Sequence, residues 1–252
     1  MRTEASGARL LAIRAVNALG KPFGIDPVPR AFPNGSKGPA DRGAVFDRIY
    51  RTNSWGSRES RSGLGSESLV AAAYRRRLRD CLADINAVRL FDAPCGDLNW
   101  MAPLAHDRAI QYCGADISKS LLRDLRSTYP ELNLERLDIC EDPFPDADVW
   151  HCRDCLFHLP FADIRRALEN FAKSAIPYCL LTTHRARIHR NLDVSAGGFR
   201  YLDLEREPIL LPRAERYLKD FRLGRDFPRY VGLWRRQTIA ECVEVWTDRL
   251  LS

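Results

Sequence analysis

The stretch FDAPCGDLNW (residues 91–100) reads as the end of a buried strand, followed by a Pro-Cys-Gly turn and the start of a helix. In open α/β sheets, ligands bind beyond the carboxyl ends of the strands, and the first strand, turn and helix usually touch the ligand. Gly96 lets a ligand approach the backbone closely because it has no Cβ. The stretch therefore predicts an α/β fold and the place of its site.

The chain after this turn alternates between strands and helices. Strand-like runs are VRLFDA (88–93), IQYCGAD (110–116), LNLERLD (132–138), ADVWHCRD (147–154) and IPYCLLTT (176–183), and the clearest helical stretches are 67–85, 119–129 and 161–174. Such alternation is typical of a doubly wound, mostly parallel sheet with helices on both faces.

The region before the sheet has a different composition. Residues 1–43 are predicted to form a short N-terminal helix and then a flexible arm. The arm is KPFGIDPVPRAFPNGSKGPADRG (21–43), which is rich in proline and glycine. A single domain is expected over 44–252. Within it, 44–87 would form helices and a lid, and 88–252 would form the core with a long loop at 184–206.

Composition limits the classes of protein that fit. The 252 residues are 45% hydrophobic and 29% charged, and no apolar run approaches the roughly 18 residues of a membrane span, so a cytoplasmic protein is expected. The eight cysteines are interpreted as reduced thiols, and the pair Cys152 and Cys155 has no second half for a zinc site. The net charge of +6 is spread along helices and predicts no nucleic-acid partner.

Carboxylates stand at the ends of the first three predicted strands. Asp92 and Asp97 flank the first turn, where they would repel a pyrophosphate and attract a cation, and G-x-G-x-x-G is absent. Asp116 stands where a carboxylate accepts hydrogen bonds from ribose hydroxyls, and Asp138 with Ile139 could hold an adenine ring. Together they suit an adenosine that carries an amino acid, which is the composition of S-adenosylmethionine.

On these residues the sequence resembles the class I S-adenosylmethionine-dependent methyltransferases. LFDAPCGDLNWM (90–101), YCGADIS (112–118) and ERLDIC (135–140) stand at the first three motifs, DVWHCRDCLFHL (148–159) resembles the fourth strand and its loop, and VGLWRR (231–236) resembles a last strand. Pro94 and Leu98 depart from the glycines of the first motif.

The resemblance implies a Rossmann-like methyltransferase fold with seven strands and an N-terminal helical extension. It also implies that the cofactor contacts Asp92, Pro94, Cys95, Gly96, Asp97, Trp100, Asp116, Ile117, Asp138, Ile139 and Arg153.

The motifs IYRTNSWGSRESRSGLGS (49–66), PCGDLNWM (94–101) and CRDCLFHLPFADI (152–164) resemble a subgroup associated with sugar and polysaccharide biosynthesis. This implies an O-methyltransferase for a small-molecule or oligosaccharide acceptor. His158 is the first candidate for the general base, because imidazole titrates near neutrality, and a structural histidine is the alternative. Asp154 would orient His158, bind an acceptor hydroxyl or join a site for a divalent metal such as Mg²⁺, which is left open.

Two loops are expected to cover the acceptor, although either could be a surface connector. The first would contribute Trp55, Glu59 and Ser62, and the second would contribute His184, Asn191, Asp193 and Arg200. Their planar rings, donors and acceptors fit a carbohydrate. A homodimer is left open.

Four alternatives compete with this interpretation. One is a nicotinamide oxidoreductase, which the missing G-x-G-x-x-G and the acidic first turn disfavour. A nucleic-acid methyltransferase that acts on a base amino group would carry an Asn/Asp-Pro-Pro-aromatic run where this chain has RDCL (153–156). A methyltransferase for another small molecule also fits the motifs, and a non-catalytic nucleotide-binding protein would share the fold without the chemistry.

Overall fold

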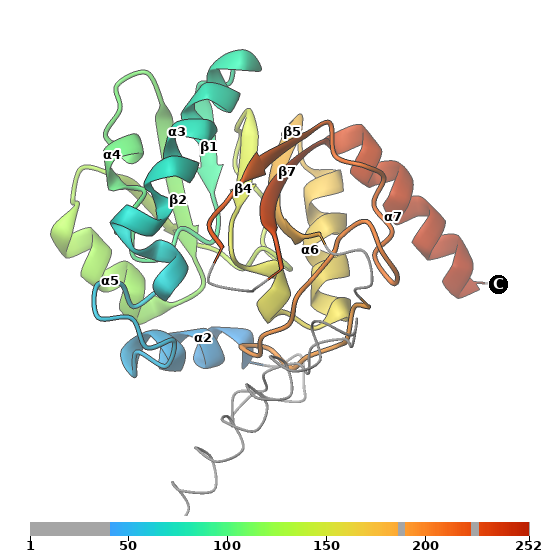
Figure 1. The fold of residues 1–252 in the computed structure, drawn as a ribbon, viewed down its shortest axis with the longest axis horizontal. Coiled ribbons are helices and arrows are strands. Elements are labelled where there is room, and N and C mark those ends of the chain that lie inside the picture. Colours follow the sequence, from blue (N-terminus) through green and yellow to red (C-terminus); the bar gives the residue numbers. More distant parts are fainter. Residues whose placement is uncertain (1–40, 186–189, 223–226, 252) are drawn as a thin grey trace, which may run out of the picture.

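The computed structural model describes residues 41–185, 190–222 and 227–251, and a seven-stranded sheet runs through its centre (Figure 1). The strand order is β3-β2-β1-β4-β5-β7-β6. β1 to β5 pair in parallel, whereas β7 runs antiparallel to both β5 and β6. The strands are β1 (Arg89–Asp92), β2 (Gln111–Asp116), β3 (Asn133–Arg136), β4 (Val149–Cys152), β5 (Tyr178–His184), β6 (Arg216–Lys219) and β7 (Arg229–Arg235).

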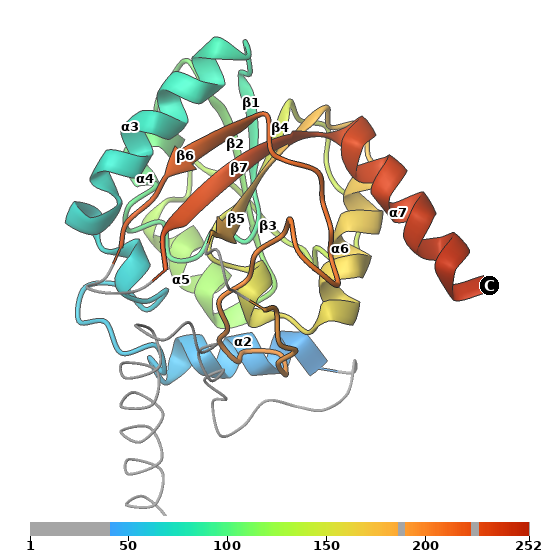
Figure 2. The ribbon, with the colours of Figure 1, turned by 45° about the vertical axis from the view of Figure 1, so that its right-hand side comes forward.

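Helices cover both faces of this sheet (Figure 1). α3 (Ser68–Asp84), α4 (Ala102–Ala105) and α5 (Lys119–Thr128) pack on one face, and α6 (Phe161–Lys173) and α7 (Arg236–Leu251) pack on the other. α2 (Arg42–Arg51) lies across the end of the sheet where the parallel strands finish (Figure 2). The doubly wound fold, the parallel strands and the three longer predicted helices are thus confirmed.

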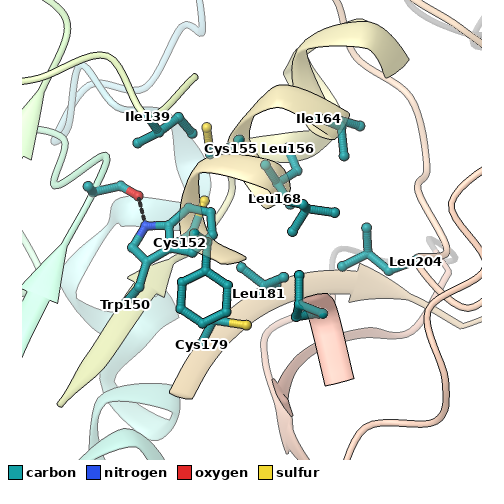
Figure 3. Packing of buried hydrophobic residues seen from close by; sticks show 14 of the residues in the cluster. Ile139, Trp150, Cys152, Cys155, Leu156, Ile164, Leu168, Cys179, Leu181 and Leu204 are labelled. Atoms are coloured by element: carbon teal, nitrogen blue, oxygen red, sulfur yellow. Dashed lines mark hydrogen bonds between the residues drawn. The ribbon is translucent and has the colours of Figure 1, made fainter. Parts of the chain in front are cut away.

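Successive side chains of the central strands point to opposite faces of the sheet and pack into two separate hydrophobic cores. Leu90 points into the cluster beneath α3, whereas its neighbour Phe91 joins the cluster beneath α6. In the second cluster Trp150 is fully buried and donates its Nε1 proton to the Ala93 carbonyl at 2.9 Å (Figure 3). All eight cysteines are free thiols, and Figure 3 shows some of them packed as small apolar side chains in this core.

The boundaries differ from the sequence prediction at both ends. α2 begins at Arg42, because the Asp41 side chain accepts a hydrogen bond from the Ala44 amide at 3.0 Å and caps the helix. β6 and α7 were not predicted as elements. The predicted N-terminal helix and most of the arm fall on residues 1–40, outside the described residues. Within the described ranges, no helix combines the length and the apolarity that a membrane crossing requires.

Candidate active site

A cleft of about 990 Å³, counted to its open mouth, lies at the carboxyl ends of β1, β2 and β4. α2 and residues 53–66, here called the lid, form its roof. Both predicted catalytic residues and all the predicted cofactor residues except Asp97 line this cleft, namely His158, Asp154, Asp92, Pro94, Cys95, Gly96, Trp100, Asp116, Ile117, Asp138, Ile139 and Arg153. The cleft thus brings together residues that are far apart in the sequence.

The first turn keeps the backbone shape that glycines would give it. Gly96 has a φ of +58°, and a Cβ there would lie 2.7 Å from Ser62 Oγ in the lid. Leu98 also has a positive φ of 57°, a conformation that costs a residue with a side chain about 1–2 kcal/mol. The buried Leu98 side chain offsets this cost by packing in the core beneath α3. The departure from the glycine motif therefore leaves the turn open to a ligand.

Asp116 ends β2 at the floor of the cleft. Its carboxylate accepts hydrogen bonds from the Ser118 amide at 2.9 Å and from the Gly96 amide at 3.3 Å. Burial raises the pKa of Asp116 and the hydrogen bonds from the amides lower it. Burial is the larger effect, and the pKa is about 6. A carboxylate that is held in place by backbone amides and has lone pairs to spare suits the hydroxyls of a ribose.

Asp138 lies at the next strand end and is paired with α2. Arg42 donates to its Oδ2 from Nε at 3.1 Å and from Nη2 at 2.7 Å. The apolar side chains of Ile117 and Ile139 also line the cleft. These residues fit a flat apolar ring, whereas the contact of Asp138 with an adenine amino group stays a prediction.

Asp92 belongs to a buried chain of hydrogen bonds beneath the cleft. Tyr112 donates its hydroxyl proton to Asp92 Oδ2 at 2.7 Å, and His151 donates from Nδ1 to Oδ1 at 2.6 Å. The Tyr74 hydroxyl lies 2.9 Å from His151 Nε2. Burial raises the pKa of both tyrosines well above the ordinary value, so they stay protonated.

Sequence reasoning missed this chain, although His151 lies inside the fourth motif. The parallel pairing of β1 with β4 sets His151 directly beside Asp92, and only the register of the sheet reveals it. Asp92 is thus held in place by hydrogen bonds to Tyr112 and His151.

Asp97 fastens the lid to the first turn instead of lining the cleft. Its carboxylate accepts hydrogen bonds from Ser60 Oγ at 2.8 Å and from the Arg61 amide at 2.8 Å, and its own amide donates to Ser62 Oγ at 2.9 Å. Asn99 adds a bond from Nδ2 to the Ser66 carbonyl at 2.9 Å. The position of the lid is thus tied to the turn that holds the predicted cofactor site.

His158 sits in the 3-10 turn η4 (Leu156–His158) with one ring nitrogen committed. Its Nδ1 lies 2.5 Å from the Gly198 carbonyl, and because a carbonyl only accepts, Nδ1 carries the proton. Burial lowers the pKa of His158 to about 4, so the ring is neutral near pH 7 and its Nε2 is a proton acceptor. The ring of Trp55 stacks on it at 4.9 Å between centroids.

Arg153 and Asp154 follow β4, and the Asp154 carboxylate lies near the guanidiniums of Arg153 and Arg229. Arg229 donates to Asp154 Oδ2 at 2.9 Å, whereas Oδ1 is buried without a hydrogen-bond partner among the described residues. Burial alone would raise the pKa of Asp154, but the Arg229 and Arg153 guanidiniums hold it below the ordinary value. Arg153 is bound through two bonds of 2.9 Å to the buried carboxylate of Asp220.

The lid supplies two of the predicted acceptor residues to the cleft, Trp55 and Ser62. Glu59 lies outside it, where its Oε1 accepts from the Ser68 amide at 2.8 Å at the start of α3. The structure places Glu59 as a helix-capping group because that amide has no partner within α3. The acceptor contacts of Trp55 and Ser62 stay predictions.

The long loop after β5 contacts the back of the His158 turn. Arg200 donates to the Leu159 carbonyl at 2.7 Å, Asn191 Nδ2 donates to the Asp203 carbonyl at 2.8 Å, and the Asp193 carboxylate accepts from the Phe161 amide at 2.8 Å. His184 is buried and accepts from the Leu202 amide at 3.2 Å. None of these four residues lines the cleft, because each satisfies backbone groups that a buried loop would otherwise leave unpaired.

The described part of the chain holds no group of three or more His, Cys, Asp or Glu side chains that is arranged to bind a metal ion. At Asp154, the carboxylate that the sequence offered to a divalent metal, two guanidiniums already supply the positive charge. Protein cations at that distance disfavour a hard metal ion there.

Comparison with known proteins finds a family match in the region that holds the cleft. Residues 90–177 match the model of a family described as a methyltransferase domain. This range is thus similar to a methyltransferase domain. The matched range runs from β1 almost to β5 and includes Asp92, Asp116 and His158.

Solved structures show the same fold. The methyltransferase domain of bacterial CtHen1-CN is 17% identical, with a TM-score of 0.52 over 66% of this chain and 99% of that chain. Magnesium protoporphyrin IX methyltransferase (ChlM) from Synechocystis PCC 6803 with bound SAM is 12% identical, with a TM-score of 0.53 over 79% of this chain and 99% of that chain. A comparison of this chain with curated proteins gave no significant match.

Proposed function

We propose that this protein transfers a methyl group from S-adenosylmethionine to a hydroxyl of a sugar or glycoside, with His158 as the general base. The observation that carries the proposal is the hydrogen bond from His158 Nδ1 to the Gly198 carbonyl. It fixes the tautomer in which Nε2, on a residue that lines the cleft, is free of a proton. A hydroxyl acceptor has to lose its proton as it attacks, and this nitrogen is ready to take it.

The residues of the cleft fit the donor. When bound, S-adenosylmethionine supplies a methyl group on a positively charged sulfur. The carboxylate of Asp116 would bind the ribose hydroxyls, and the negative charge of Asp92 would favour a cationic ligand. Gly96 leaves room at the turn, since a Cβ there would meet the lid.

The lid would align the acceptor and exclude water. Trp55 presents an aromatic face beside His158, and aromatic faces pack against the apolar faces of sugar rings. Asp154 Oδ1, buried and without a partner among the described residues, would accept a hydrogen bond from a second acceptor hydroxyl. The likeness of the lid and fourth motifs to the sugar-modifying subgroup points to the same acceptor class.

The test is transfer of labelled methyl from S-adenosylmethionine to a panel of sugars, glycosides and RNA by the full chain, with and without chelator. We expect a labelled sugar or glycoside. His158→Ala should lower turnover by about a hundredfold or more, while binding of the demethylated donor stays within about twofold. His106→Ala is the matched control, because His106 is exposed and outside the cleft.

Transfer only to RNA would overturn the sugar assignment. Unchanged turnover in His158→Ala would overturn the general base and leave the activity itself standing.

A further inference from the structure

Among the described residues, three arginines line the cleft, and two of them are paired with carboxylates. Arg42 contacts Asp138 at 2.7 Å, Glu141 at 2.6 Å and Asp163 at 3.0 Å. Arg153 is held by the two-bond pair with Asp220, whose side chain is fully buried. The donor groups of both guanidiniums are therefore already engaged by carboxylates of this chain.

Arg61 is the third, and its setting differs. It is exposed in the lid, and its guanidinium lies 5.3 Å from the centre of the Tyr50 ring. Among the described residues, no carboxylate lies within ion-pair distance of it. A guanidinium that stacks on a ring and keeps its donors free is suited to a planar anion such as a carboxylate.

The backbone of the lid places Arg61 beside the first turn. The Arg61 amide donates to Asp97 Oδ2 at 2.8 Å. The next residue, Ser62, accepts from the Asp97 amide at 2.9 Å, and its Oγ is the atom that a Cβ on Gly96 would meet. Arg61 therefore sits next to the turn that would carry the amino-acid part of the donor.

We infer that Arg61 binds the α-carboxylate of the donor's amino-acid part through its guanidinium, while Asp92 provides the negative charge for the cationic groups. This assignment rests on the proposed donor, S-adenosylmethionine. Opposite charges on two sides of the turn complement a ligand that carries one carboxylate and one ammonium group. The contact also links donor binding to the lid, since Arg61 belongs to the segment that covers the cleft.

Two ligands separate this role from a general loss of binding. S-Adenosylhomocysteine carries the carboxylate, whereas 5′-methylthioadenosine has the same adenosine and sulfur without the amino acid. Calorimetric titration of the full chain measures both dissociation constants. Arg61→Gln should raise the dissociation constant of S-adenosylhomocysteine by about tenfold to a hundredfold and that of 5′-methylthioadenosine by less than about twofold. Arg61→Lys should retain part of the lost affinity, because it keeps the charge without the planar fork.

Arg58→Gln is the matched control, because Arg58 is exposed in the same lid and does not line the cleft. It should leave both dissociation constants unchanged. Equal S-adenosylhomocysteine affinity in Arg61→Gln and the unmodified chain would overturn the inference, and so would an equal loss for both ligands. If the unmodified chain bound neither ligand, the donor assignment itself would fail, which is a different result from an Arg61 variant without effect.

Discussion

The burial of the His158 ring determines its protonation state. Because burial lowers the pKa to about 4, the ring is neutral above roughly pH 5, and only the neutral ring accepts a proton. At saturating donor and acceptor, we expect kcat to stay flat between about pH 5 and 7.5 and to fall as the pH drops through about 4. An inflection near pH 6.5 in the kcat profile would contradict this assignment.

Asp116 should make donor binding depend on pH in a different range. Its pKa is raised by burial to about 6, so the carboxylate is charged above that pH and protonated below it. Since a charged carboxylate binds hydroxyls more strongly, the affinity for S-adenosylhomocysteine should fall as the pH drops from about 7.5 to 5. Asp116→Asn should bind more weakly and without this dependence. Titration calorimetry across the range measures both.

Gly96 and Gly56 offer a matched pair of substitutions, because φ is positive at both, +58° and +73°. Alanine at either site should cost about 1–2 kcal/mol of unfolding free energy for the backbone conformation alone, and at Gly96 the close approach to Ser62 adds to this cost. A Cβ at Gly56 meets nothing within 4 Å, whereas one at Gly96 meets Ser62 Oγ. Only Gly96→Ala should therefore weaken S-adenosylhomocysteine binding, by about tenfold or more. Equal affinities in the two variants would argue against a turn closed by the lid.

At the scale of elements, α2 is held over the cleft by Arg42. Its guanidinium is almost fully buried among three carboxylates, and removal of one partner from a buried ion pair costs about 3–5 kcal/mol. We expect Arg42→Ala to lower the free energy of unfolding in urea by about that amount. Arg51→Ala, at the exposed end of the same helix, should change it by about 0.5 kcal/mol or less.

The lid is a second element whose position depends on a few bonds to the first turn. Asn99 Nδ2 donates to Glu59 Oε1 at 2.7 Å and to the Ser66 carbonyl. Asn99→Ala should speed hydrogen exchange of the amides in residues 57–66 by about tenfold and leave the sheet amides unchanged. Asn170→Ala removes a comparable pair of bonds on α6 and should not affect the lid. Unchanged exchange in the lid would show that other contacts hold it.

For the whole molecule, the eight free cysteines predict stability without disulfides. The midpoint of urea unfolding should be the same with and without a reducing agent, because no bond is there to be reduced. A thiol reagent should modify the native protein slowly and all eight thiols after unfolding, since most of them are buried and burial raises the pKa of several, to about 12 for Cys113. A midpoint that falls on reduction would contradict this expectation.

The elements that could be predicted are those whose signal is local. Parallel strands buried on both faces give continuous apolar runs, as in the segments that became β1, β4 and β5, and the helices between them carry the 3.6-residue period. β6 was missed because this edge strand is short and half exposed. α7, which directly follows the last strand, was also not predicted.

The sequence by itself determined the order of strands and helices and the chemical groups at the strand ends, because both follow from local periodicity and from the geometry of parallel sheets. Only the tertiary structure decided which of those groups face the cleft. Strand register placed His151 beside Asp92, and a backbone carbonyl of the distant loop fixed the proton on His158. The tertiary structure also engages the side chains of Glu59, Asn191, Asp193 and Arg200 in hydrogen bonds with backbone groups. The physical reason is that a buried polar group must find a partner in three dimensions, and spacing along the chain does not specify which one.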